Sequence, residues 1–295
     1  MSCTEEQLHQ YLKHINYPKE KHASEPLRLL EELQACQLST VPFESTALHY
    51  SKHRLLSLDL DDLFQKIVID GKGGYCMELN TFFGAVLRGL GFTLINIGAR
   101  VKNGDRYGSW GHMANLVTID DKRYLVDVGF GADGPMRPVP LQNGYEYLVL
   151  PRQLGKLEYR SLAQHTDPNQ RIWVYSIQDI AIAEWRECYC FTDLEYFPED
   201  FVAMNLSPMT RPTSFFVKTV LAMRAIIDEQ TSIATGIITL YKDTIKRKYM
   251  GEVEVLETLQ NETQRIKALE RYFGIVLKPS EQKAIRGLPT ELIEQ

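Results

Sequence analysis

The hydrophobic residues of this chain change their spacing near residue 90, and this change restricts the folds open to it. Before residue 90, apolar side chains recur every three or four positions, which predicts amphipathic helices. Ser24 is expected to cap the second of them. The apolar positions are Leu8, Leu12, Ile15, Leu29, Leu30, Leu33, Leu60, Leu63, Phe64, Ile67 and Val68. Residues 1–90 are therefore predicted to form a small helical bundle.

From Phe92 onward the apolar residues alternate, or are β-branched, in short runs. This period of two is typical of strands, and Asp120 and Asp121 supply a two-residue turn between two of the runs. The strand-like runs are FTLINIGARV, HMANLVTID, KRYLVDVGF, YEYLVL, IWVYSI and ECYCF. Residues 91–205 are predicted to be mostly sheet, closed or strongly curled.

The last ninety residues mix both patterns. A strand-like run opens IATGIITLYKDTIKRK, whereas NETQRIKALERYFG is helical, with Asn261 as its cap and Gly274 as its stop. The preceding run SFFVKTVLAMRAIID fits neither period clearly. The chain is thus predicted to be an α+β protein in three parts, residues 1–90, 91–205 and 206–295.

Composition narrows the functional classes. The chain has 295 residues and a net charge of -5, without the basic excess of a nucleic-acid-binding surface. It shows no basic-then-apolar leader and no run of about 18 apolar residues, so neither export nor a membrane span is expected and a cytoplasmic location is predicted. Five cysteines without CxxC pairs predict free thiols and no structural metal.

One cysteine stands where chemistry is favoured. In GKGGYCMELN, Cys76 directly precedes an amphipathic run that Gly91 ends, which places the thiol at a helix N-terminus. The helix dipole and unpaired N–H groups there favour a thiolate, and Gly73 and Gly74 allow close backbone approach. On this segment alone, a tight structural turn is an equal alternative to a nucleophile.

A nucleophilic thiol needs a base and a group that orients the base. If the turn at Asp120 and Asp121 pairs its flanking strands, His112 lies diagonally beside Asp127 on one sheet face, and a slip of one residue would separate them. Asp127 stands in an apolar strand, where a carboxylate needs a partner. The other histidines are expected at the surface: His9, His14, His22, His49, His53 and His165.

Together, the segments GGYC, VPFE and VDVGFG and the Gly-His pair that opens a strand resemble the arylamine N-acetyltransferase family. The residues around the cysteine look most like those of microbial, and in particular fungal, members. The resemblance implies a helical bundle, a β-barrel and an α/β lid, with a catalytic core related to cysteine proteases and transglutaminases. It also implies a Cys76–His112–Asp127 triad, which takes an acyl group from acyl-coenzyme A and passes it to an arylamine, arylhydrazine or N-hydroxyarylamine.

The resemblance implies two further sets of residues. The coenzyme A set combines a glycine-rich loop, RYGSWGH, whose backbone would face the pyrophosphate, with hydroxyl residues of NLSPMTRPTSFF; it contains Gly108, Ser109, Gly111, Thr213 and Ser214. The acceptor set would wall the pocket for a flat aromatic amine; it contains Phe43, Tyr75, Val101 and Phe130.

The chain departs from the family pattern beside the cysteine. Lys72 stands where the family usually has arginine, and Ser45 where it usually has asparagine. If that arginine braces Glu44, lysine keeps the ion pair but cannot form a bidentate fork, which predicts looser support of the cysteine turn.

Alternatives to the acyltransferase are a hydrolase or transglutaminase-like enzyme with the same triad, and a binding protein without turnover, which an intact triad disfavours. Acyl-coenzyme A is expected as a donor substrate, with no permanently bound cofactor. The sequence leaves open whether the acyl group is acetyl, propionyl or malonyl, which amine accepts it, and the oligomeric state.

Overall fold

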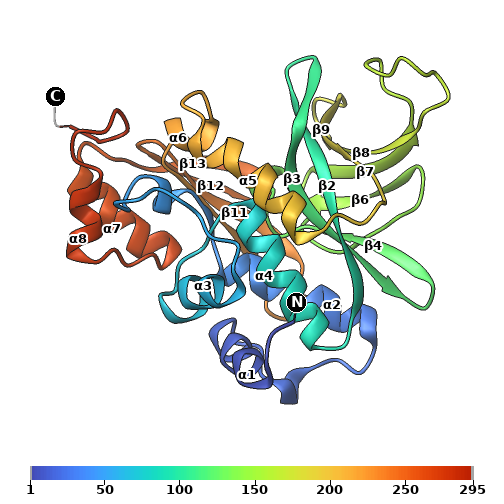
Figure 1. Ribbon diagram of the computed structural model, residues 1–295, viewed down its shortest axis with the longest axis horizontal. Coiled ribbons are helices and arrows are strands. Elements are labelled where there is room, and N and C mark those ends of the chain that lie inside the picture. Colours follow the sequence, from blue (N-terminus) through green and yellow to red (C-terminus); the bar gives the residue numbers. More distant parts are fainter. Residues whose placement is uncertain (1, 294–295) are drawn as a thin grey trace.

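The computed structural model describes residues 2–293 and has the three predicted parts in the predicted order (Figure 1). The helices are α1 (Glu5–His14), α2 (Pro26–Thr40), α3 (Leu60–Phe64), α4 (Cys76–Gly89), α5 (Pro198–Thr210), α6 (Phe215–Lys218), α7 (Glu262–Phe273) and α8 (Pro279–Ala284). Within the described residues, no helix is both long and apolar enough to cross a membrane.

The N-terminal helices begin at side-chain caps. Thr4 accepts a hydrogen bond from the Gln7 N–H at the start of α1. The cap expected at Ser24 is wrong by one residue, because the longer Glu25 side chain reaches the N–H groups of Leu27 and Arg28. A π-helical turn, Gln65–Ile69, continues α3.

The middle of the chain forms an eight-stranded, nearly closed antiparallel sheet in the order β5-β4-β3-β2-β9-β8-β7-β6. The strands are β2 (Thr93–Asn103), β3 (Arg106–Ile119), β4 (Lys122–Val126), β5 (Val139–Pro140), β6 (Tyr145–Leu150), β7 (Gln153–Arg160), β8 (Ile172–Asp179) and β9 (Trp185–Phe191). The predicted hairpin register is confirmed, since Ile119 pairs with Lys122 across the turn.

The C-terminal sheet has the order β1-β10-β11-β12-β13. Its strands are β1 (Phe43–Glu44), β10 (Leu221–Ile227), β11 (Ala234–Tyr241), β12 (Thr244–Tyr249) and β13 (Glu252–Thr258), and α7 packs against it. The segment without a clear period, SFFVKTVLAMRAIID, is α6 followed by β10. The first strand of this sheet, β1, thus comes from the N-terminal part of the chain, so the chain crosses between the parts more than once. The predicted boundary at residue 205 falls inside α5.

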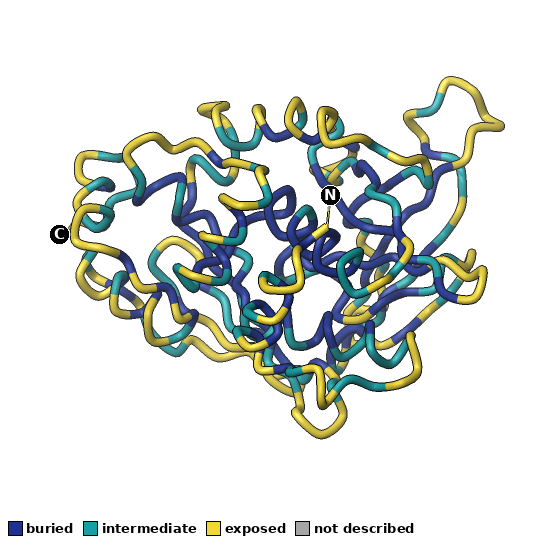
Figure 2. Tube along the Cα trace, turned by 60° about the horizontal axis from the view of Figure 1, so that its bottom comes forward, coloured by how far each residue is buried: buried dark blue, intermediate teal, exposed yellow. Residues whose placement is uncertain are grey.

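Helix α4 is the element on which the other parts converge. Figure 1 shows it between the N-terminal helices and β2–β3, and eleven of its fourteen residues are buried. Figure 2 shows the same pattern along the chain, with buried segments inside and exposed loops around them. Because α4 is buried along most of its length, its first residue, Cys76, has a fixed position relative to the barrel strands.

The turn between β3 and β4 is predicted to limit stability. Asp120 and Asp121 have φ angles of 46° and 61°, a region that costs energy for residues with a Cβ atom. We expect Asp121→Gly to raise the free energy of unfolding by about 0.5 kcal/mol. The control Lys122→Gly, inside β4, is expected to lower the free energy of unfolding by a similar amount. Urea unfolding followed by tryptophan fluorescence checks both, and a destabilised Asp121→Gly would contradict the turn geometry.

Candidate active site

Cys76 is the first residue of α4, as the sequence predicted, and only 3% of it is exposed. Its sulfur lies 3.9 Å from the Gly111 carbonyl oxygen. Close packing fixes this end of the helix, because a Cβ atom at Gly129 would fall 2.6 Å from the Cys76 Cα. Only glycine at position 129 leaves room for the helix to approach the end of the β4 segment so closely.

His112 and Asp127 meet as the predicted register requires. The His112 Nε2 and the Asp127 Oδ2 lie 2.7 Å apart, and each residue is 1% exposed. The rings of Phe130 and Tyr189 each lie 5.0 Å from the imidazole and hold it in place. Nε2 bonds Asp127, and the Cys76 side chain lies close enough to the imidazole to contribute to raising its pKa.

The electrostatics of the site favour a charged imidazole. Burial lowers the pKa of His112, but the Asp127 charge and hydrogen bond, with a smaller contribution from Cys76, outweigh burial and raise this pKa to about 10. Burial acts to raise the pKa of Asp127, and the His112 charge nevertheless holds it below its ordinary value. The site therefore places a charged imidazole near the Cys76 side chain.

Asn80 orients the carboxylate, and sequence reasoning missed it. Its Nδ2 donates to Asp127 Oδ1 at 2.9 Å and to the Met113 carbonyl at 2.7 Å, while its Oδ1 accepts the Val128 N–H at 3.0 Å. The Gly129 N–H also donates to Asp127 Oδ1, at 2.9 Å. Asn80 lies four residues after Cys76, one helical turn onward, and this spacing was the available signal.

The residues predicted to wall an acceptor pocket are not equally close to the site. Phe130 contacts His112, and both Phe43 and Tyr75 contact Phe216, with ring centres 6.0 and 5.0 Å apart. Val101 is 37% exposed on β2, where it pairs with Tyr189 of β9. Phe216 was missed, because only the return of the chain at α6 brings it to Phe43.

The stretch expected to be a loop before His112 is part of a strand. Gly108, Ser109 and Gly111 lie within β3, whose pairing with β2 shifts register beside them. Thr213 is exposed, and Ser214, which precedes α6, donates to the Pro208 carbonyl at 2.6 Å. A coenzyme A contact at these five positions stays a prediction.

Two expectations about charged or titratable side chains are wrong. His49 is fully buried, and its Nε2 lies 2.9 Å from the Phe216 carbonyl oxygen and its Nδ1 3.0 Å from Thr290 Oγ1; contacts from distant segments cover it. Among the other five histidines, His9 and His53 are exposed and the rest are half-buried. Lys72 pairs with Glu281 of α8 rather than with Glu44, because its side chain turns toward the C-terminal helices.

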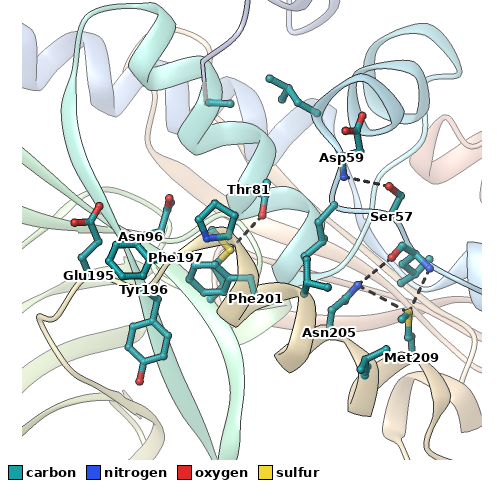
Figure 3. A pocket seen from close by; sticks show the side chains of 18 of the residues that line it. Ser57, Asp59, Thr81, Asn96, Glu195, Tyr196, Phe197, Phe201, Asn205 and Met209 are labelled. Atoms are coloured by element: carbon teal, nitrogen blue, oxygen red, sulfur yellow. Dashed lines mark hydrogen bonds between the residues drawn. The ribbon is translucent and has the colours of Figure 1, made fainter.

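A cavity of about 640 Å³ lies between α4 and α5, outside the Cys-His-Asp group (Figure 3). Thr81 borders it from α4, and Phe201 and Asn205 border it from α5. Met113 separates it from the neighbouring His112, since successive strand side chains point to opposite faces. Within residues 2–293, no group of three or more histidine, cysteine or acidic side chains could hold a metal ion.

A helix-start cysteine beside a buried His–Asp pair is the arrangement of enzymes with a cysteine nucleophile. Residues 26–282 match the family model described as N-acetyltransferase. The chain belongs to this family, and the resemblance to arylamine N-acetyltransferases is confirmed.

The similar proteins come from fungi, animals and bacteria. The N-malonyltransferase FDB2 of Gibberella moniliformis is 35% identical over 88% of this chain and 81% of the relative, and arylamine N-acetyltransferase 2 of Mesocricetus auratus is 26% identical over 91% and 93%. The Salmonella typhimurium arylamine N-acetyltransferase matches with a TM-score of 0.81 at 23% identity, over 97% of this chain and 98% of that one. The Mycobacterium marinum enzyme in complex with CoA matches with a TM-score of 0.78 at 25% identity, over 95% and 97%. These matches confirm the predicted fold.

The charge on His112 predicts a dependence of stability on pH. Because its pKa is higher in the folded state (about 10) than its ordinary value of 6.5, its contribution is complete below pH 6.5 and is lost as the pH rises through about 10. We expect the difference in unfolding free energy between wild type and His112→Gln to shrink from pH 6 to pH 10. Urea unfolding at both values measures it, and a difference that grows with pH would contradict the assignment.

Asn80→Ala is expected to slow alkylation of Cys76 by iodoacetamide about tenfold, because loss of a hydrogen bond to a charged group costs about 1.5–3 kcal/mol. The matched control is Asn96→Ala. Asn96 donates to Asn115 Oδ1, further along the same polar network, and has no bond to Asp127. Asn96→Ala should lower the free energy of unfolding without slowing the alkylation of Cys76. Intact-protein mass spectrometry measures the rates, and a wild-type rate for Asn80→Ala would show that Asp127 is oriented without it.

Proposed function

We propose that the protein is an acyl-coenzyme A-dependent N-acyltransferase that works by a ping-pong mechanism, with Cys76 as the acyl carrier. The observation that carries the proposal is the buried His112–Asp127 pair beside the cysteine at the start of α4. Membership of the N-acetyltransferase family supports the reaction class.

In the first half-reaction, the Cys76 thiolate attacks the carbonyl carbon of the donor thioester. The carbon–sulfur bond to coenzyme A breaks, coenzyme A leaves as a thiol after taking a proton from the His112 imidazolium, and the acyl group stays on Cys76. Asp127 holds the imidazole in the required orientation and does not take its proton. A thioester is exchanged for a thioester, so this step is nearly balanced in energy.

In the second half-reaction, the amine nitrogen attacks the acyl-cysteine carbonyl. The now neutral His112 accepts the amine proton, the bond between sulfur and carbon breaks, and an amide is released. The rings of Phe43, Tyr75, Phe130 and Phe216 offer apolar surface to a flat aromatic amine or hydrazine. Amide formation is downhill and draws the sequence to completion.

We propose malonyl-coenzyme A as the preferred donor, because relatives named N-malonyltransferases have a higher identity to this chain than those named arylamine N-acetyltransferases. The N-malonyltransferases of Gibberella moniliformis and Fusarium pseudograminearum are 35% and 34% identical to this chain, compared with 26% for the arylamine N-acetyltransferase 2 of Mesocricetus auratus. We assign donor contacts to Gly108, Ser109, Gly111, Thr213 and Ser214 from the family motifs. The Mycobacterium marinum complex with CoA supports a coenzyme A thioester as substrate.

The test is intact-protein mass spectrometry after brief mixing with acetyl-, propionyl- or malonyl-coenzyme A, without amine. We expect wild type to gain the mass of one acyl group, fastest with malonyl-coenzyme A, and Cys76→Ala to gain none. Addition of an aromatic amine should remove the added mass and yield the amide.

Each other outcome has a distinct meaning. Faster labelling by acetyl-coenzyme A would overturn the donor preference and keep the acyltransferase. If no donor labels Cys76 although iodoacetamide alkylates it rapidly, the acyltransferase proposal fails and a hydrolase with the same triad takes its place.

A further inference from the structure

Three charged side chains lie behind the turn that delivers Cys76. Glu44 and Glu78 are 1% and 2% exposed, and the Lys66 side chain, on the π-helical turn, is 17% exposed. The Lys66 Nζ lies 2.6 Å from Glu78 Oε1 and 3.9 Å from Glu44 Oε1. One ammonium group therefore stands between two buried carboxylates.

Each carboxylate also accepts a hydrogen bond from a backbone N–H group. Glu78 Oε2 accepts the N–H of Tyr75, the residue before Cys76, at 3.2 Å, and Glu44 accepts the N–H of Thr46. Gly74 links the two segments, because the Glu44 N–H donates to its carbonyl at 2.8 Å. A Cβ atom at Gly74 would lie 2.7 Å from Glu78 Oε2, so the turn packs directly on this carboxylate.

The cluster depends on its single cation. Two buried carboxylates repel each other, and a buried charge without a partner is costly. Within the described residues, Glu44 Oε1 accepts no hydrogen bond, and its one ion pair is with the Lys66 ammonium. Burial raises the pKa of Glu78 above its ordinary value even with Lys66 opposing it. Without Lys66, Glu78 would have to take up a proton or the turn would have to admit water.

We infer that Lys66 is a positioning residue for the nucleophile: by neutralising Glu44 and Glu78 it fixes the turn from Gly74 to Cys76, and thereby the Cys76 sulfur, relative to His112. The inference rests on the proposed role of Cys76. The sequence motif had led us to expect Lys72 to support the turn before Cys76. The inference gives that role to Lys66 on the π-helical turn.

Lys72 provides the contrast within the same chain. It lies four residues before Cys76, yet it pairs with Glu281 of α8 and so ties the turn's outer side to the C-terminal helices. The two lysines have the same charge and lie within the same ten residues. They differ in whether the partner carboxylate touches the backbone of the cysteine turn.

The experiment compares the rate of Cys76 alkylation by iodoacetamide in folded variants at 25 °C, followed by intact-protein mass spectrometry. Lys66→Gln is expected to react at least about tenfold more slowly than wild type. Lys66→Arg should keep most of the rate, and Lys66→Gln with Glu78→Gln should regain part of it, because the orphaned carboxylate is gone and an amide oxygen still accepts the Tyr75 N–H. Lys72→Gln, the matched control, should react at the wild-type rate.

Thermal unfolding of each variant separates positioning from stability. A Lys66→Gln protein that is less stable but alkylated at the wild-type rate overturns the inference, as does equal slowing by Lys72→Gln. If Lys66→Gln does not fold, the other variants decide. The inference is overturned if the double variant is alkylated no faster than the unfolded chain. It is also overturned if Lys66→Arg loses the wild-type alkylation rate. Alkylation needs no donor, so wild type that reacts with iodoacetamide but not with acyl-coenzyme A refutes the proposed function separately.

Discussion

The buried carboxylate of Asp127 is the constraint on which the rest of the site depends. An ionised carboxylate at 1% exposure is tolerated only when its oxygens are fully engaged, and here His112, Asn80 and the Gly129 N–H engage them. Each of these donors comes from a different element or turn. Satisfying one charge therefore aligns α4, β3 and the end of β4, and this alignment also brings the Cys76 sulfur to the imidazole.

Gly129 makes this convergence sterically possible, and a bulge at Gly111 accompanies it. At Gly129 the backbone approaches the first turn of α4 more closely than any Cβ atom would allow. At Gly111 the β2–β3 pairing slips, so that Ala99 opposes His112 while Arg100 opposes Trp110, and one residue is left over. The bulge bends β3 beside Cys76 and turns the Gly111 carbonyl toward the sulfur. A Cβ atom at Gly111 would meet only the Ser109 carbonyl oxygen, at 3.7 Å, so the bulge itself does not require glycine there.

Local patterns were sufficient to predict much of this architecture. The helix that starts at Cys76 and the hairpin that pairs His112 with Asp127 depend on periodicity and on a turn of two residues, both encoded within about 25 residues. Asn80 and Phe216 were missed because their contacts with Asp127 and Phe43 join segments far apart in the chain. His49 was misjudged for the same reason, since residues 216–290 cover it. Lys66 was missed because its partner Glu78 lies twelve residues onward, beyond the spacing of neighbours on one helix. Short motifs predict the local structure and chemistry of a segment, whereas the burial of its side chains depends on which other segments pack against it.

The apolar surroundings of Cys76 come from more than one part of the chain. Cys76 is 3% exposed and belongs to an apolar cluster that also contains Phe201 of α5, with Phe216 of α6 packed against that cluster. These two helices have few internal hydrogen bonds at this point, because α6 has four residues and Pro208 has no N–H to donate within α5. The reacting groups belong to α4 and the barrel, where packing is tight. The Cys-His-Asp geometry is thus fixed by α4 and the barrel, whereas part of the apolar cluster around Cys76 comes from helices that follow the barrel in the chain.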